Sequence, residues 1–231
     1  MDTIGERIRA VQQAASSQAM LSATWALANS DHGESVNTEA IHCLVEVLGF
    51  NNPGAAVAAV EGLIRLGPAA VQPILDSLDP RNYGARAWAV RALAGIGDVR
   101  GLELLEEALG TDVGPSVRRA AACGLGSLRL ETLEAPQRLA VRERSLQALL
   151  AGCRDGEWVV RYAVSVGLES LGLRQDPRLQ ERQHLLEALA ALGQPEREET
   201  AVVRLRARLA LQRILALSGG AAEPDPAGAQ P

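Results

Sequence analysis

The chain contains no lysine and is poor in aromatic residues and cysteine. All 23 basic side chains are arginine, and the 231 residues include three Trp, two Tyr, one Phe and three Cys. An odd number of cysteines without paired spacing argues against a disulfide framework and favours a reducing compartment such as the cytoplasm. Few aromatic residues and few β-branched runs argue against a sheet-rich fold. The composition therefore predicts an all-α protein.

The charge balance and the polar content argue against a nucleic-acid-binding protein, a membrane protein and an exported protein. The net charge of −5 and the pI of about 5.3 argue against sequence-independent nucleic-acid binding, which needs an excess of cations. The longest uncharged stretch, Ala10–Ser30, is rich in Gln, Ser, Thr and Asn, so it predicts an amphipathic helical segment and no membrane insertion. Met1–Arg9 carries both charge signs and no apolar core segment follows, so we expect no signal peptide.

An internal repeat organises the chain. The segment Glu61–Gly67 recurs in related form at Arg91–Gly97, Cys123–Arg129 and Val166–Gly172. The anchor leucine of each copy is its third residue, at positions 63, 93, 125 and 168. The last interval is longer because the segment Glu131–Glu143 is inserted there.

Each repeat carries two helical patterns. The first half has apolar residues at helical spacing, which are Ile41, Leu44, Val45 and Leu48 in one unit and Val71, Ile74, Leu75 and Leu78 in the next. The second half has one small or apolar face, for example Ala85, Trp88, Ala89, Ala92, Leu93 and Ile96. Ten residues before the anchor, Pro53, Tyr83, Pro115 and Trp158 mark the start of the second helix, and Gly67, Gly97 and Gly172 predict left-handed caps at its end.

A helical hairpin of this size cannot bury its apolar face alone, so consecutive hairpins must stack. We therefore predict a right-handed α-solenoid of HEAT-like repeats that forms a single domain over residues 1–217. An N-terminal cap over 1–37 consists of a helical segment, Thr3–Asn29, and the polar loop Ser30–Asn37. Four clear repeats follow over 38–173, and then a degenerate pair over 174–217 with helices near Pro177–Leu192 and Glu198–Leu217. Residues 218–231, after the domain, are predicted to be a disordered tail.

Arginine stands seven residues before the anchor in three of the four units, at Arg86, Arg118 and Arg161. The favoured interpretation is a structural ladder in which each guanidinium bonds loop carbonyls or a neighbouring carboxylate. The alternative is a row of forked donors that binds carboxylates or phosphates of a ligand.

The rare aromatic residues concentrate in two equivalent corners, Tyr83 with Trp88 and Trp158 with Tyr162. Trp88 takes a position that is small in the other units, so it either fills a local gap, the favoured interpretation, or opens onto a pocket. In the second case, an aromatic and arginine cluster on or beside the inner surface of the superhelix suits a flat, conjugated ligand that bears carboxylates. Its members are Tyr83, Arg86, Trp88, Arg91, Trp158, Arg161 and Tyr162.

Histidine and cysteine give no metal or nucleophile motif. His42 and Cys43 are helix neighbours that diverge by about 100°, so no metal site is expected. Cys43 and Cys153 are expected in the core, whereas Cys123, near Arg119, is the candidate reactive thiol. The segment that holds Asp31, His32 and Glu34 is interpreted as an ordinary polar loop, with acid–base work as the less favoured alternative, and His184 is interpreted as part of a solvated face.

Two runs carry a family resemblance, Gly49–Leu63 and Asn82–Asp98, and Asn-Tyr-Gly-Ala-Arg-Ala-Trp at the start of the second is the most specific part. With Ser116–Ala121, Gly124–Arg129 and Glu157–Ala163, they make Thr38–Gly172 resemble the F-type (β) subunit of the heterodimeric E/F phycobilin lyases, which are HEAT-like proteins.

The resemblance implies an enzyme that is active only with an E-type partner. Such a pair attaches phycocyanobilin through a thioether to a cysteine of the phycocyanin α-subunit, so the pigment is the substrate and no cofactor is expected. The modified protein supplies the thiol, which explains why no nucleophile motif is needed. Arginines at the pigment's propionates and an aromatic wall along its rings are the expected binding groups, and the catalytic residues stay unassigned. The implied location is cytoplasmic, including phycobilisomes at the thylakoid surface.

Isomerising relatives carry an Asn-His-Cys motif, whereas this chain has Ile41-His42-Cys43 on a repeat helix. Ligation without isomerisation is therefore favoured. The alternative from another class is a non-catalytic HEAT scaffold or chaperone for apo-phycobiliprotein and phycobilisome assembly, and a third is a factor that detaches pigment from the same proteins.

Overall fold

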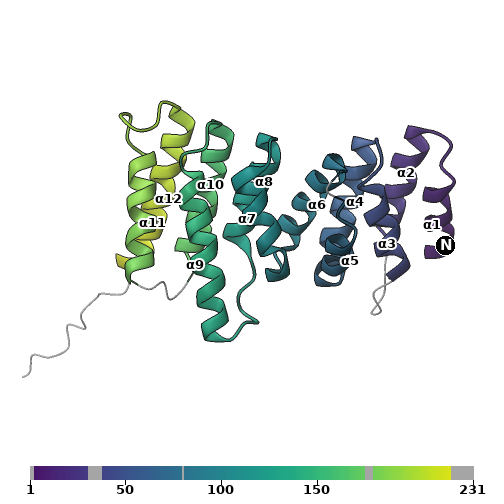
Figure 1. Ribbon diagram of the computed structural model, residues 1–231, viewed down its shortest axis with the longest axis horizontal. Helices are drawn as coiled ribbons and strands as arrows, with labels where there is room; N and C mark the ends of the chain where they lie inside the picture. The colour runs from purple at the N-terminus through teal and green to yellow at the C-terminus, as the bar shows by residue number, and fades with distance from the viewer. Residues whose placement is uncertain (1–2, 31–37, 80, 175–178, 220–231) are drawn as a thin grey trace, which may run out of the picture.

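The computed structural model describes residues 3–30, 38–79, 81–174 and 179–219, which form a row of six helical hairpins (Figure 1). The first helices of the hairpins are α1 (Ile4–Gln12), α3 (Thr38–Val47), α5 (Val71–Asp76, preceded by the 3-10 turn η1, Gly67–Ala70), α7 (Leu102–Thr111, preceded by η2, Val99–Gly101), α9 (Ala135–Gly152) and α11 (Leu179–Leu192). The second helices are α2 (Ser17–Ala28), α4 (Pro53–Leu66), α6 (Tyr83–Ile96), α8 (Pro115–Ser127), α10 (Trp158–Gly172) and α12 (Ala201–Gly219). The predicted all-α solenoid is confirmed.

The second helices form the more closely spaced of two layers, since each packs directly on the next from α2 to α12. Small residues permit this approach: a Cβ on Gly126 of α8 would lie 2.4 Å from the Cα of Gly167 on α10. A layer with shorter spacing lies on the inner side of a superhelix. The accessible face of each second helix therefore looks onto the inner surface, because its own first helix and two neighbouring second helices cover its other sides.

Most predicted helix ends are confirmed. Pro53 and Pro115 lie in the first turn of α4 and α8, and Gly97 takes the predicted left-handed conformation, with φ 70° and ψ 22°. Gly67 has a positive φ of 66° but a ψ of −140°, so the predicted left-handed cap is wrong there. The predicted left-handed cap at Gly172 is wrong, because this residue ends α10 in helical geometry. A Cβ at Gly172 would lie 2.6 Å from Cδ1 of Ile214, so this glycine is required by close packing against α12.

The expectation of one helical segment over Ala10–Ser30 is also wrong. The chain turns after α1, and Ser16 caps α2 by accepting a hydrogen bond from the Ala19 amide at 3.1 Å. The cap is therefore itself a hairpin. The polar-loop residues Asp31, His32 and Glu34 lie outside the described residues, as do residues 220–231 of the predicted tail, whereas α12 extends to Gly219.

The apolar stripes of the repeats meet in one continuous core, in which Ile41, Leu44, Val45 and Leu48 are all buried. Among the described residues, only the run Pro53–Asp76 is long and apolar enough by composition to cross a membrane. Half of its most apolar window is buried within the fold, and η1 interrupts it. Core helices of repeat proteins pass the same test, so this run is weak evidence for a membrane span.

The approach of α8 to α10 predicts a strong effect of one methyl group. Gly126→Ala should lower the free energy of unfolding by about 1–3 kcal/mol, because the new Cβ meets backbone atoms that cannot rotate away. Gly110→Ala is the control, since a Cβ on this exposed α7 residue has no neighbour within 4 Å and should be neutral or stabilising by up to about 1 kcal/mol. Urea unfolding followed by circular dichroism measures both, and equal stabilities would contradict the packing described.

Candidate functional site

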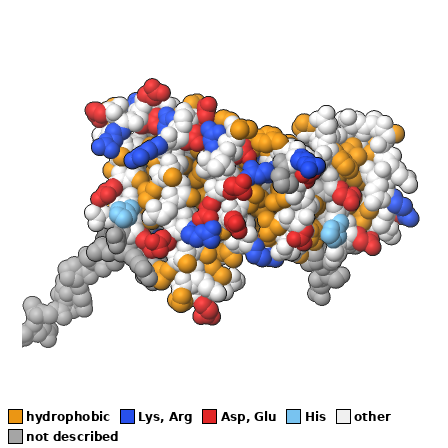
Figure 2. Space-filling view, viewed as in Figure 1, with side chains coloured by type: hydrophobic (Ala, Val, Ile, Leu, Met, Phe, Trp, Pro, Cys, Tyr) orange, Lys and Arg blue, Asp and Glu red, His pale blue; other side chains and the backbone are white. Residues whose placement is uncertain are grey.

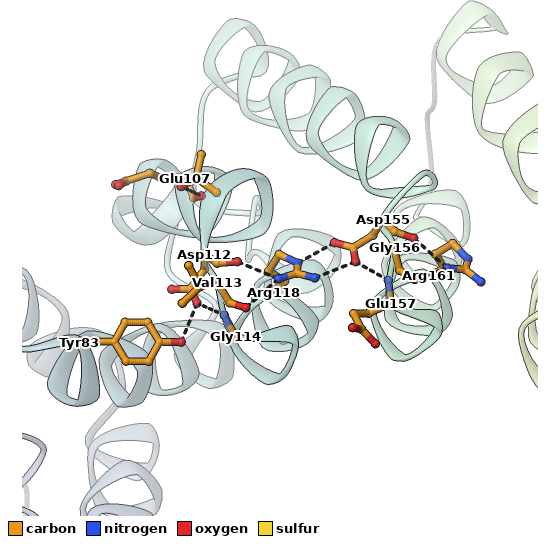
Figure 3. Close-up of polar contacts among 11 residues, drawn as sticks. Tyr83, Glu107, Asp112, Val113, Gly114, Arg118, Asp155, Gly156, Glu157 and Arg161 are labelled. Carbon is orange, nitrogen blue, oxygen red and sulfur yellow. Dashed lines mark hydrogen bonds and ion pairs between the residues drawn. The ribbon is translucent and has the colours of Figure 1, made fainter.

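The arginines seven residues before each anchor form a ladder along the turns that join first to second helices (Figure 3). Arg118 on α8 shows the pattern most completely. Its Nε and Nη2 donate to the two carboxylate oxygens of Asp155 at 2.7 and 2.9 Å. Its Nη1 donates to the backbone carbonyls of Asp112 and Val113, at 2.8 and 3.3 Å. Arg118 thus joins its own turn to the carboxylate of the next turn.

Arg161 repeats this geometry in full, and Arg86 repeats the pairing with a carboxylate of the next turn. Arg161 on α10 donates to both carboxylate oxygens of Glu198, at 2.6 and 2.8 Å, and to the carbonyl of Asp155 at 2.8 Å. Arg86 on α6 pairs with Asp112 at 2.9 Å and with Glu107 at 3.0 Å. Charged side chains of both signs accordingly gather along the turn edge over α10 to α12 (Figure 2). The structure supports the ladder interpretation for all three arginines.

Two of the ladder carboxylates, Asp155 and Glu198, stay ionised although they are nearly enclosed. Burial works against the charge of Asp155, yet hydrogen bonds from Arg118 and the Glu157 amide hold its pKa below the ordinary value. Hydrogen bonds from Arg161 lower the pKa of Glu198 against the effect of burial, and the Thr200 amide adds to them. These groups therefore stabilise the fold in their charged form.

The predicted aromatic and arginine cluster divides into two groups on different faces. Tyr83, Arg86, Trp158 and Arg161 lie at the turn edge, where Tyr83 Oη donates to Asp112 at 2.9 Å and both arginines bond carboxylates of this chain. Tyr83 and Trp158 are close to half exposed there. The remaining members of the cluster, Trp88, Arg91 and Tyr162, are partly exposed residues of the inner-face helices α6 and α10.

Arginines on the inner face have no carboxylate partner in the described part of the chain. The Arg91 guanidinium carbon lies 4.4 Å from the centroid of the Trp88 ring, and its Nη2 donates to Ser116 Oγ at 3.1 Å. Arg119, one helix further along on α8, is exposed and makes no ion pair with the described residues. These two cations remain available to an anion, unlike Arg86, Arg118 and Arg161.

Cys123 lies on the inner side of α8 and is partly buried. Burial raises the pKa of its thiol, against the opposing charges of Arg119 and Arg206, so the thiol is protonated at neutral pH. Arg206 and Arg213 of α12 both pair with Glu169 of α10. Arg206 Nη1 is buried and has no hydrogen-bond partner among the described residues.

The other cysteines behave as packing residues. Cys43 is buried and burial raises its pKa to about 11, while Cys153 packs against the core with its pKa raised to about 12 by burial. His42 points to solvent on α3, away from the buried side that holds Cys43. The described residues contain no group of three or more His, Cys, Asp or Glu side chains placed to hold a metal ion.

Sequence reasoning missed the acceptors of the ladder. Asp112, Asp155 and Glu198 each precede an arginine by six residues, namely Arg118, Arg161 and Arg204. This recurring acidic position was the available signal. It also identifies Arg204 of α12 as a fourth ladder position, which the weaker repeat pattern of the last hairpin concealed.

Comparison with known proteins agrees with the fold and refines the class. A family model for HEAT repeats matches residues 44–126 and 71–169, so the chain is a HEAT-repeat protein. It is 44% identical over 207 residues to the phycocyanin alpha phycocyanobilin lyase CpcF of Synechocystis, covering 90% of this chain and 92% of that one. It is 53% identical over 176 residues to the bilin biosynthesis protein RpcF of Synechococcus, covering 76% and 81%.

A solved structure shows the same relationship. In the complex of CpcE and CpcF of phycocyanin lyase from Nostoc, the matched chain is 42% identical, with a TM-score of 0.66 over 75% of this chain and 99% of the other. The chain belongs to the family of phycocyanobilin lyase β-subunits.

The ladder predicts a defined loss of stability in acid. The pKa values of Asp155 and Glu198 are lower in the folded state than in the unfolded state. Their contribution to the free energy of unfolding is therefore complete above the unfolded-state pKa values of about 4, and it is lost as the pH falls through the folded-state pKa values. The free energy of unfolding should therefore decrease steeply below about pH 4.5. Urea titrations between pH 3 and 7, followed by circular dichroism, measure this decrease.

Removing one acceptor carboxylate tests whether the ladder causes this loss of stability in acid. Glu198→Gln should cost roughly 2–4 kcal/mol at pH 7, because Arg161 loses its charged partner, and should flatten the acid dependence. Glu199→Gln is the matched control, because this neighbouring side chain is exposed. Equal losses in the two variants would show that the ladder does not stabilise the fold.

Proposed function

We propose that this chain is the β-subunit of a heterodimeric lyase that joins phycocyanobilin to a cysteine of the phycocyanin α-subunit. CpcF, the relative from Synechocystis, carries that activity in its name, and the solved structure from Nostoc is a complex of CpcE and CpcF. The observation that carries the proposal is the inner face, where Trp88 lies beside Arg91, whose described contacts include no carboxylate. The proposed location is the cytoplasm, at phycobilisomes.

The two kinds of arginine differ in what they offer to a pigment with two propionate groups. A propionate at the ladder would have to displace Asp112, Asp155 or Glu198 from a formed ion pair. At Arg91 and Arg119 it would meet a guanidinium that lacks a carboxylate, and charge-assisted hydrogen bonds of this kind are the strong ones. We therefore assign the propionates to the inner face and a structural role to Arg86 and Arg161.

Aromatic side chains supply the complementary contact for the conjugated rings. Trp88 is partly exposed and has Arg91 against its ring, and Tyr162 is a partly exposed aromatic residue of α10. In this proposal, the partner subunit and the acceptor protein enclose a pigment that lies on an open surface.

The proposed reaction is the addition of the acceptor thiol across the exocyclic double bond of the pigment. The carbon–sulfur bond forms as the carbon–carbon π bond breaks, and the thiol proton ends on the pigment, so no oxidant or reductant is consumed. This chain holds one face of the pigment toward the incoming sulfur, which is catalysis by orientation. Cys123 is kept protonated by burial, so we propose that it does not carry the pigment in the reaction.

Reconstitution tests the proposal. The chain, a CpcE-type subunit, phycocyanobilin and apo-phycocyanin α-subunit are mixed, and the covalent adduct is followed by absorbance and located by mass spectrometry. Adduct should form at the native cysteine only when both subunits are present. A scaffold or chaperone would leave the adduct yield and its position unchanged when this chain is omitted, and that result would overturn the lyase assignment.

Side-chain variants test the inner face. Arg91→Gln and Arg119→Gln should each reduce kcat/KM for the pigment by about tenfold or more, the effect of removing a hydrogen bond between charged groups. Arg9→Gln, an exposed arginine on α1, is the control for the change in charge. Cys123→Ser should keep transfer at the native rate. Full activity of both α6 and α8 arginine variants would refute the assigned site, and loss of transfer with Cys123→Ser would indicate a covalent intermediate.

A further inference from the structure

The arginine ladder continues to the last helix and ends there without its acceptor. Arg204 on α12 donates from Nη1 to the carbonyls of Glu198 and Glu199, at 2.8 and 2.7 Å. Arg118 and Arg161 make the same pair of bonds to their own turns. Both also hold a carboxylate from the following turn, whereas Arg204 has no ion pair with the described residues. The fourth ladder position therefore has the bonds to its own turn but lacks the pairing with a carboxylate of a following turn.

The side of α12 that would face a further hairpin is open. On α10 the corresponding surface consists of Arg161, Ser165, Glu169 and Gly172, and α12 covers the last three completely enough to bury them. Their counterparts on α12, placed by the ladder register, are Arg204, Arg208, Gln212 and Leu215. Arg208 and Gln212 are exposed and Leu215 is 49% exposed.

An apolar stripe adjoins this open side. Val202, Leu205 and Leu209 follow one another at helical spacing and are 43%, 64% and 40% exposed. They occupy the positions that Val159, Tyr162 and Val166 take on the inner face of α10. The exposed surface of α12 thus combines basic groups with large aliphatic side chains, the composition of a surface that a protein partner covers.

The charge of this end favours an acidic occupant. Helix α12 contains four arginines and no acidic residue, in a chain whose net charge is −5. Arg206 and Arg213 share the single carboxylate of Glu169, and Arg204 and Arg208 have no carboxylate partner among the described residues. The partner should therefore present Asp or Glu at the place that Asp155 and Glu198 take within this chain.

A second copy of the chain does not supply that carboxylate. At the opposite end of the row, the turn between α1 and α2 is Gln13–Ser16, and the turn between α3 and α4 runs over Leu48–Asn52 (Figure 1). Neither turn contains an acidic residue. End-to-end stacking of identical chains would leave Arg204 unpaired, so the occupant is a different protein.

We propose that the C-terminal end of the solenoid, formed by Arg204, Leu205, Arg208, Leu209 and Leu215, docks a helical hairpin of a second protein whose inter-helix turn carries a carboxylate. That carboxylate completes the fourth rung by pairing with Nε and Nη2 of Arg204. The identification of the second protein as the CpcE-type subunit rests on the proposed function. The location of the docking surface at the C-terminal end of the solenoid does not rest on it.

Affinity measurements with the full-length chain and a CpcE-type subunit test the docking end. Arg204→Gln and Leu205→Glu should each weaken the complex by about tenfold or more in isothermal titration calorimetry. Leu205 is largely exposed in this chain, so its variant keeps the test valid if Arg204→Gln also loosens its own turn. Arg9→Gln, at the other end of the row, should bind as the native chain does. Hydrogen exchange along α12 should slow in the complex.

The outcomes separate this inference from the proposed function. If the native chain binds the CpcE-type subunit and transfers pigment but both α12 variants bind equally well, the docking end is wrong and the lyase assignment stands. Loss of affinity with Arg9→Gln alone would place the partner at the N-terminal end and also overturn the inference. A native chain that neither binds this subunit nor transfers pigment would overturn the proposed function. Self-association through α12, detected by sedimentation, would refute the argument against a second copy.

Discussion

The pairing of each ladder arginine with the carboxylate of the next turn is the interaction on which the arrangement of the molecule depends. Small residues let the second helices approach, but an apolar contact between Gly126 and Gly167 tolerates sliding and rotation. A guanidinium that holds two carbonyls of its own turn and two oxygens of the next does not, because its five donors lie in a fixed plane. The ladder therefore sets the register of one hairpin on the next, and the core fills the space that results.

This constraint also decides which cations are free to bind a ligand. Arg86, Arg118 and Arg161 all carry charges that carboxylates of the chain already balance. Arg91 and Arg119 lie on the face that the stacking leaves uncovered, and neither forms an ion pair with the residues that the structure describes. The same row of helices thus separates arginines that hold the solenoid together from arginines that face the solvent on its inner surface. The binding surface that we propose for an anionic pigment would follow from this stacking, without a dedicated domain.

The sequence predicted what is periodic and failed where an interaction joins different repeats. The hairpins, the starts at Pro53 and Pro115 and the left-handed cap at Gly97 follow from local chemistry. Gly172 was misjudged because its requirement is contact with Ile214, two helices later in the chain. The predicted site was divided because Tyr83 and Trp88 are five residues apart and point about 140° away from each other on a helix. The acceptor carboxylates recur six residues before an arginine, but that arginine is not the one they pair with. Glu198 pairs with Arg161, 37 residues earlier, so the local pattern alone does not show the partner.

A ladder built from directed pairs has an inherent asymmetry, because each unit donates forward and accepts from behind. The first hairpins of this chain lack both groups of the ladder. Ala56 stands where later repeats have the arginine donor, and the turn before it, Leu48–Asn52, has no acidic residue that could act as the acceptor. The last hairpin, in contrast, ends on a donor, Arg204, whose other bonds already orient its guanidinium. The Arg204 side chain is therefore already ordered before a partner binds. A carboxylate from another protein can form a charge-assisted hydrogen bond with it at little further loss of side-chain entropy. Self-stacking gains nothing comparable, which makes the polarity of the ladder a source of specificity for a different partner.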